Sequence, residues 1–150
     1  MASIRNDQDL RQVLESLSPE QQRHIGGIFI ESALDLCDDS MIRRAVQVAM
    51  DPESSDDVRE DAFRSAKAYA VKTYAECGKD TDWTRQAAHF VGVAAACLLS
   101  DEQPGGDRAW RVAMQVRNAR NCGLIAQEGG KDIEDEAEQQ RQIAREYVGM

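Results

Sequence analysis

Histidine is scarce in this chain, which carries only His24 and His89 among its 150 residues. Neither histidine stands in a Glu-x-x-His or His-x-x-x-His spacing, so the ligand motifs of a ferritin-like di-iron centre are absent. His24 follows Glu20 by four residues, a spacing typical of a surface pair on one side of a helix. We therefore predict no metal site and no cofactor.

The four cysteines form no metal-binding pair either. Gaps of 40, 20 and 25 residues separate Cys37, Cys77, Cys97 and Cys122, so no Cys-x-x-Cys is present to begin a zinc site. Each cysteine stands beside apolar residues, which is typical of a buried free thiol in a reducing compartment. The first ten residues lack the apolar segment of a secretion signal. Together these features predict a cytoplasmic protein.

Long apolar segments and catalytic motifs are also missing. The longest nearly apolar stretch, residues 87–99, has 13 residues and includes a histidine, which is too short to cross a bilayer. No serine stands in a Gly-x-Ser-x-Gly context, and the glycine pairs at 26–27, 105–106 and 129–130 do not extend into a phosphate-binding loop. We predict no membrane association and no enzyme activity.

Basic residues are outnumbered by acidic ones. The chain has 18 lysines and arginines against 27 aspartates and glutamates, which gives a formal net charge of −9. The acidic excess lies in residues 1–40 and 131–150, while the middle of the chain is close to balanced. Such a surface repels phosphate backbones and anionic lipids, so we predict no nucleic-acid partner. The charge is typical of a soluble protein, and docking on a basic protein partner is the alternative explanation.

Aromatic residues make up only 5% of the chain, so small and aliphatic side chains must build the core. Apolar residues recur at helical spacing, and no strand-like alternation of useful length occurs. Helices are predicted over residues 7–17, 19–37, 40–50, 56–77, 82–99, 107–128 and 131–148. They indicate an all-α fold, a compact and mostly antiparallel bundle of six or seven helices in one domain of residues 1–150. The nearly all-apolar helix 82–99 is predicted to be buried at the centre.

One helix contains an unusual pair of glycines. Ser18 and Pro19 are typical of a helix start, with Gln21 at the position that completes a capping box. Gly26 and Gly27 then fall in the helix interior, where each costs about 1 kcal/mol relative to alanine. Two alternatives fit this pattern: another backbone packs closely against the glycines, or the helix breaks there.

Two arginines and an asparagine lie where apolar residues are expected. On a helix over residues 107–128, Arg117, Arg120 and Asn121 fall within the apolar arc of the surface. A guanidinium there must be paired, must bind a ligand, or must extend its charged end to solvent. One interpretation is internal pairing with acidic side chains. The candidates are Glu31, Asp35 and Glu76.

The alternative interpretation is a small anionic-ligand site between helices, because two guanidiniums supply forked donors for a carboxylate or a phosphate. Antiparallel packing of the helix 82–99 against its neighbours sets His89 level with Arg117 and brings Tyr69 close to His89. The predicted ligand-binding residues are His89, Arg117, Arg120, Asn121 and Tyr69. No catalytic residue is predicted.

The function that the sequence favours is non-catalytic: an inhibitor, adaptor or accessory protein that docks on a basic partner through an acidic surface. Small size, acidity and helical content are loosely similar to those of immunity proteins that neutralise basic enzymes, an analogy of composition alone. The protein would act as a monomer or a homodimer. The predicted docking residues are Asp35, Asp38, Asp39, Asp56, Asp57, Asp61, Glu134, Asp135, Glu136 and Glu138.

Overall fold

The computed structural model describes residues 3–76, 82–100, 106–126 and 133–149. In these residues the chain forms seven α-helices and one short 3-10 helix, with no strand. They are α1 (Asp7–Ser16), α2 (Pro19–Glu31), η1 (Leu34–Leu36), α3 (Ser40–Met50), α4 (Asp56–Glu76), α5 (Trp83–Leu99), α6 (Arg108–Ala126) and α7 (Ile133–Val148). The all-α bundle predicted from the sequence is confirmed.

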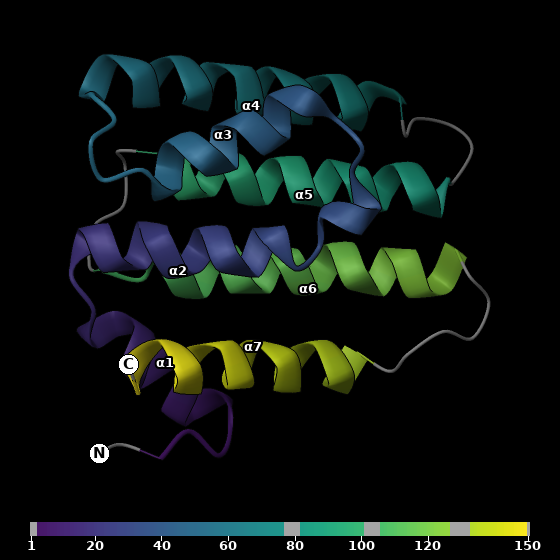
Figure 1. Ribbon diagram of the computed structural model, residues 1–150. Helices are drawn as coiled ribbons and strands as arrows, with labels where there is room; N and C mark the ends of the chain where they lie inside the picture. Colours follow the sequence, from purple (N-terminus) through teal and green to yellow (C-terminus); the bar gives the residue numbers. More distant parts are fainter. Residues whose placement is uncertain (1–2, 77–81, 101–105, 127–132, 150) are drawn as a thin grey trace.

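Successive long helices run in opposite directions, and the bundle has α4 along one edge and α7 along the other (Figure 1). Between these edges lie α5 and then the neighbouring helices α2 and α6, while the shorter α3 packs on α4 and α2. α5 contacts α2, α3, α4, α6 and η1. It is therefore the central helix that the apolar segment 82–99 predicts.

The glycine pair in α2 marks a close contact and not a break, because α2 is continuous from Pro19 to Glu31. A Cβ atom at Gly26 would come within 2.6 Å of Cδ1 of Leu98 on α5, and one at Gly27 would collide with the Met50 side chain on α3. Both glycines therefore let neighbouring side chains reach the α2 backbone, and the first of the two alternatives is confirmed.

α2 ends at Glu31, several residues earlier than the predicted end near residue 37. The Ser32 hydroxyl donates to the Phe29 carbonyl at 2.6 Å, and Arg120 of α6 donates to the Ser32 carbonyl at 3.1 Å. These bonds use acceptors that a longer helix would need, so the chain turns through η1 instead. The predicted ends of the helices at residues 77 and 128, and the predicted start at residue 131, lie outside the described residues.

Candidate functional site

Arg117 on α6 is held by elements from both ends of the chain. Its Nη1 and Nη2 atoms donate to the two carboxylate oxygens of Asp7 on α1 at 2.8 and 2.9 Å. Its Nε donates to Oε1 of Gln140 on α7 at 2.8 Å. The hydrogen bonds from Arg117 hold the pKa of the Asp7 carboxyl below its usual value. The guanidinium is paired internally, with a carboxylate that the sequence did not single out.

Arg120, almost one turn further along α6, is paired with one of the predicted carboxylates. Its Nη1 and Nη2 each donate to an Asp35 oxygen at 2.9 Å, and its Nε donates to Oε2 of Glu136 at 3.3 Å. Hydrogen bonding to Asp35 raises the pKa of the Arg120 guanidinium, which therefore stays charged. An anionic ligand at Arg117 and Arg120 would have to displace carboxylates already bound in forked geometry.

A partly buried network joins the N-terminal helix to the C-terminal one, and we call Asp7, Arg117, Gln140 and Arg141 the Asp7 network. Arg141 donates from Nη1 to Oδ1 of Asp7 at 2.9 Å, so Asp7 serves two arginines. Gln140 is fully buried, and its Nε2 donates to the Ala113 carbonyl on α6 at 2.9 Å while its Oε1 accepts from Arg117. The network therefore fixes α1 and α7 against α6.

Sequence reasoning missed three members of this network, namely Asp7, Gln140 and Arg141. One signal for two of them was present: Gln140 and Arg141 stand between Ala137 and Ala144 at helical spacing, and both alanines are buried. A polar pair inside a buried alanine stripe indicates a docked polar face. No comparable pattern surrounds Asp7. Its position is typical of an ordinary acidic residue in the first turn of a helix.

His89 on α5 lies against α4, as the predicted hairpin requires. Its Nδ1 is 2.9 Å from Oγ1 of Thr73, and its ring centroid is 5.8 Å from that of Tyr74. Burial lowers the pKa of His89, and a hydrogen bond with the Ala70 backbone offsets part of this effect. Among the described residues, His89 and Arg117 have no bonding partner in common.

Tyr69 and Asn121 complete the predicted ligand-binding set, and they lie in different places. The Cys37 thiol donates to the Tyr69 hydroxyl at 3.3 Å, and the Tyr69 ring covers Gly92, where a Cβ would approach the ring to 2.6 Å. Asn121 is exposed on α6, although its position in the apolar arc predicted an inward location. The five residues are thus divided among ion pairs, the contact between α4 and α5, and the surface.

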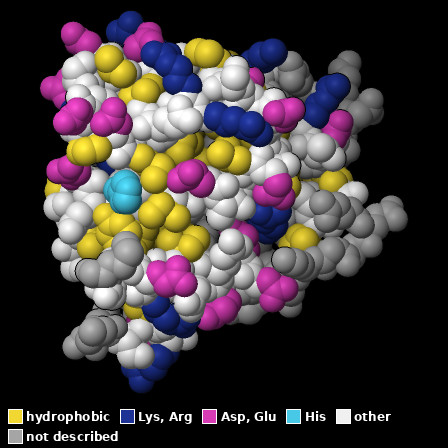
Figure 2. Space-filling model, viewed as in Figure 1, with side chains coloured by type: hydrophobic (Ala, Val, Ile, Leu, Met, Phe, Trp, Pro, Cys, Tyr) yellow, Lys and Arg dark blue, Asp and Glu magenta, His cyan; other side chains and the backbone are white. Residues whose placement is uncertain are grey.

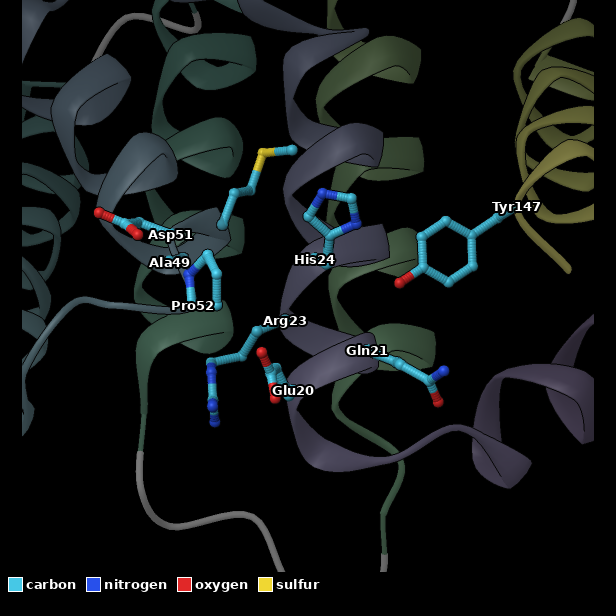
Figure 3. A pocket seen from close by; sticks show the side chains of 9 residues that line it. Glu20, Gln21, Arg23, His24, Ala49, Asp51, Pro52 and Tyr147 are labelled. Atoms are coloured by element: carbon cyan, nitrogen blue, oxygen red, sulfur yellow. The ribbon is translucent and has the colours of Figure 1, made fainter. Parts of the chain in front are cut away.

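A hollow of about 230 Å³ lies beside α2, where the C-terminal end of α3 and the end of α7 approach it (Figure 3). The rings of His24 and Tyr147 form one wall, with centroids 5.5 Å apart, and Met50 contributes from the α3 side. The lining residues are Glu20, Gln21, Arg23, His24, Ala49, Met50, Asp51, Pro52 and Tyr147. None of the residues predicted to bind a ligand lines this hollow.

Glu136 was predicted to face a partner, but only 3% of its surface is exposed to solvent. It lies on α7 against Arg120, and its second oxygen, Oε1, has no hydrogen-bond partner within the described part of the chain. Burial raises the pKa of the Glu136 carboxyl, and Arg120 opposes this effect. The prediction is corrected because the packing of α7 on α6 takes Glu136 out of contact with solvent.

Three other predicted docking residues have structural roles. Asp35 holds Arg120, and Glu138 accepts from Arg141 at 2.9 Å and from Arg145 at 2.7 Å. Asp39 caps α3, since its carboxylate accepts from the backbone N–H groups of the first helical turn at 2.8 and 3.2 Å. Asp35 and Glu138 remain more than half exposed, so they can still contribute negative potential to the surface.

Five of the remaining predicted docking residues lie on the surface. Asp38 pairs with Arg43 at 3.4 Å, Asp61 pairs with Arg44 at 3.7 Å, and Asp56 pairs with Arg59. These five exposed residues are Asp38, Asp56, Asp57, Asp61 and Asp135. The side chain of Glu134 lies outside the described part of the structure. Figure 2 shows acidic side chains spread over one face of the molecule, where a histidine lies among apolar side chains.

Within the described residues, the densest group of exposed carboxylates lies at the connection between α3 and α4. Residues 51–61 contain six acidic side chains and one arginine, and we call this stretch the acidic segment. Its carboxylates are all exposed. They are Asp51, Glu53, Asp56, Asp57, Glu60 and Asp61. Because Asp51 and Pro52 also line the hollow, the acidic segment and the hollow are continuous.

The described residues contain no group of three or more histidine, cysteine, aspartate or glutamate side chains that could hold a metal ion. In the same part of the chain, every helix is too short or too polar to cross a membrane. Cys37 and Cys97 are free thiols, and burial raises the pKa of both. No family model, curated protein or solved structure matches this chain.

Proposed function

We propose that this protein is a non-catalytic interaction protein that binds a basic partner through the acidic segment and the adjoining hollow. The observation that carries the proposal is the exposure of all six carboxylates of residues 51–61 around a single arginine. The N-terminus of α4 lies within this segment, and its dipole stabilises the negative charge there. The acidic segment therefore presents negative charge that attracts a basic surface.

The size of the hollow favours a protein partner over a small ligand. Its volume of about 230 Å³ lies below the roughly 300–1,000 Å³ of typical small-ligand pockets and suits a single side chain. Protein interfaces concentrate binding energy in a few such pockets, each filled by one buried anchor residue. His24, Met50 and Tyr147 supply apolar and aromatic walls for an anchor, with Glu20 and Asp51 beside them.

Charge supplies the rest of the recognition. A net charge of −9 speeds encounter with a basic protein, and acidic side chains around the anchor oppose an acidic competitor. An inhibitor, an adaptor and an accessory subunit all work in this way without catalysis. The free thiols of Cys37 and Cys97 suit the reducing cytoplasm, where we propose that the protein acts.

The test is quantitative capture from native lysate by the tagged protein and by a triple variant, Glu20→Gln, Glu53→Gln and Asp56→Asn. We expect a basic protein to be retained by the wild type and released at high salt. The affinity of the triple variant for this protein should fall by about tenfold, because three exposed charges each contribute about 0.5 kcal/mol.

A matched variant controls for net charge. Glu15→Gln, Glu31→Gln and Glu146→Gln remove the same three charges from exposed positions outside the acidic segment and the hollow lining. This control should keep most of the wild-type affinity. Equal loss in both variants would show that only net charge matters, and an unchanged affinity in the first variant would overturn the proposal.

A further inference from the structure

The outward side of α4 exposes large apolar side chains. Val71 is 63% exposed and Tyr74 is 74% exposed, the highest values among the large hydrophobic residues that the structure describes. Ala68, which lies on the same side, is also exposed, whereas Ala62 and Ala66 on the opposite side are buried. Single exposed apolar residues are ordinary, but a group on one helix side marks a contact surface.

Charge is divided along the same 21-residue helix. Exposed carboxylates of the first half are Asp56, Asp57, Glu60 and Asp61. The exposed basic side chains are Arg64, just before the middle of the helix, and Lys67 and Lys72 in the second half. A helix with acid in one half and base in the other complements a second copy of itself when the two copies lie antiparallel. This arrangement is the one that a twofold axis produces.

We propose that two copies of this chain associate through the outward sides of their α4 helices, packed antiparallel across a twofold axis. If the twofold axis crosses α4 near residue 66, each residue of one copy lies opposite a residue of the other copy. The numbers of two opposite residues sum to about 132. Lys72 then lies opposite Asp61 of the second copy, and Val71 lies over the acidic half of the other helix. Ala68 lies near the axis, where its small side chain permits close approach.

The interface is small, and its strength follows from its size. One helix pair buries less than the roughly 1,600 Å² of a standard protein interface, so the association is reversible, with a dissociation constant of about 10–100 μM. Raising the salt weakens it because exposed charges contribute. The hollow lies between α2, α3 and α7, away from this surface, but Asp57, Glu60 and Asp61 belong to the acidic segment as well. The second copy and the basic partner therefore compete for these three carboxylates, and the two tests are distinguishable because their variants change different residues.

Sedimentation equilibrium of the wild type and of two charge-reversal variants tests the pairing. The first variant carries Asp57→Lys and Asp61→Lys, and the second carries Lys67→Glu and Lys72→Glu. Each variant alone places like charges opposite one another and should associate at least tenfold more weakly than the wild type. A mixture of the two restores opposite charges in both halves, so it should form a heterodimer of about wild-type strength.

Apolar variants provide a second readout. Val71→Ser should weaken the dimer by several-fold, whereas Ile125→Ser, which changes a 42% exposed residue on α6, should leave it unchanged. Circular dichroism checks that every variant folds. A wild type that stays monomeric up to about 0.5 mM, far above the expected dissociation constant, overturns the proposal. A dimer that charge reversal does not weaken, or a mixture without heterodimer, overturns it equally.

Discussion

α5 and α7 pack against the same helix, α6, yet they are held there by different forces. α5 is buried through aliphatic and small residues such as Val91, Ala94 and Leu98. α7 instead buries Glu136, Gln140 and Arg141 next to two alanines. Exclusion of water holds the central helix, whereas directed polar bonds hold the terminal one. The comparison shows how an alanine-rich chain with few aromatics attaches a strongly charged last helix.

The apolar packing of α5 and the polar attachment of α7 respond differently to salt and pH. Apolar burial depends little on salt or pH, while the ion pairs of Asp7, Arg117 and Arg141 depend on both. Polar bonds also set one register, because Gln140 fits only where it reaches Arg117 and the Ala113 carbonyl together. We infer that α5 supplies most of the stability and that α7 contributes a specific geometry.

The largest loss of stability is expected from a substitution at the centre of the bundle. Leu98→Ala removes a fully buried side chain that contacts the α2 backbone at Gly26, and it should lower the free energy of unfolding by about 3 kcal/mol. Urea denaturation measures this loss, which should be the same at low and high salt. Ile125→Ala, at a partly exposed site on α6, should cost less than about 0.5 kcal/mol and serves as the control.

An intermediate loss of stability is expected from a substitution in the Asp7 network. Arg117→Met leaves Asp7 with one arginine and Gln140 with one bond fewer, and it should cost about 2 kcal/mol. The estimate lies below that for a fully buried pair because the Asp7 side chain is 44% exposed. In urea denaturation, the loss should shrink as salt rises from about 0.05 to about 0.5 M.

Arg43→Met is the matched control for the Arg117 variant. Arg43 pairs with Asp38 at 3.4 Å, and both side chains are more than half exposed, so its removal should change the stability by no more than about 0.5 kcal/mol. If the two arginine variants lose equal stability, or if the Arg117 loss is independent of salt, then α7 is held by packing and the contrast with α5 fails.

The fold was predictable because its signals are local. Helical spacing, the capping box at Ser18 and the apolar length of the central helix are properties of neighbouring residues, and each appears in the structure. The choice between a close contact and a helix break at Gly26 and Gly27 was not predictable. It depends on Leu98 and Met50, which are distant in the sequence.

The candidate site was only partly predictable, because side-chain partners depend on which helices meet. The sequence singled out Arg120 and offered Asp35 among its candidate partners, and the structure joins them. It could not offer Asp7 for Arg117, because that pair requires α1 to lie beside α6, across 110 residues of chain. The hollow is formed by three elements at once, so no local pattern indicates it.

The smallest effect is expected from Glu136→Gln, and its pH dependence separates the two modes of attachment. Burial raises the pKa of Glu136, so the folded state holds this proton more tightly than the unfolded state, whose pKa is about 4.5. The wild type therefore loses stability as the pH rises from about 4.5 through the raised pKa, and a glutamine escapes this loss.

Thermal melts of the wild type, Glu136→Gln and Asp7→Asn from about pH 2 to pH 8 test the assignment, because the contribution of Asp7 changes only below about pH 3.8. The variant should gain relative to the wild type as the pH rises. Asp7→Asn should behave oppositely, because the pKa of Asp7 is lowered and its contribution is present above about pH 3.8 and lost on acidification. If Glu136→Gln instead loses stability as the pH rises, its pairing with Arg120 outweighs burial, and α7 is held by Glu136 as well as by the Asp7 network.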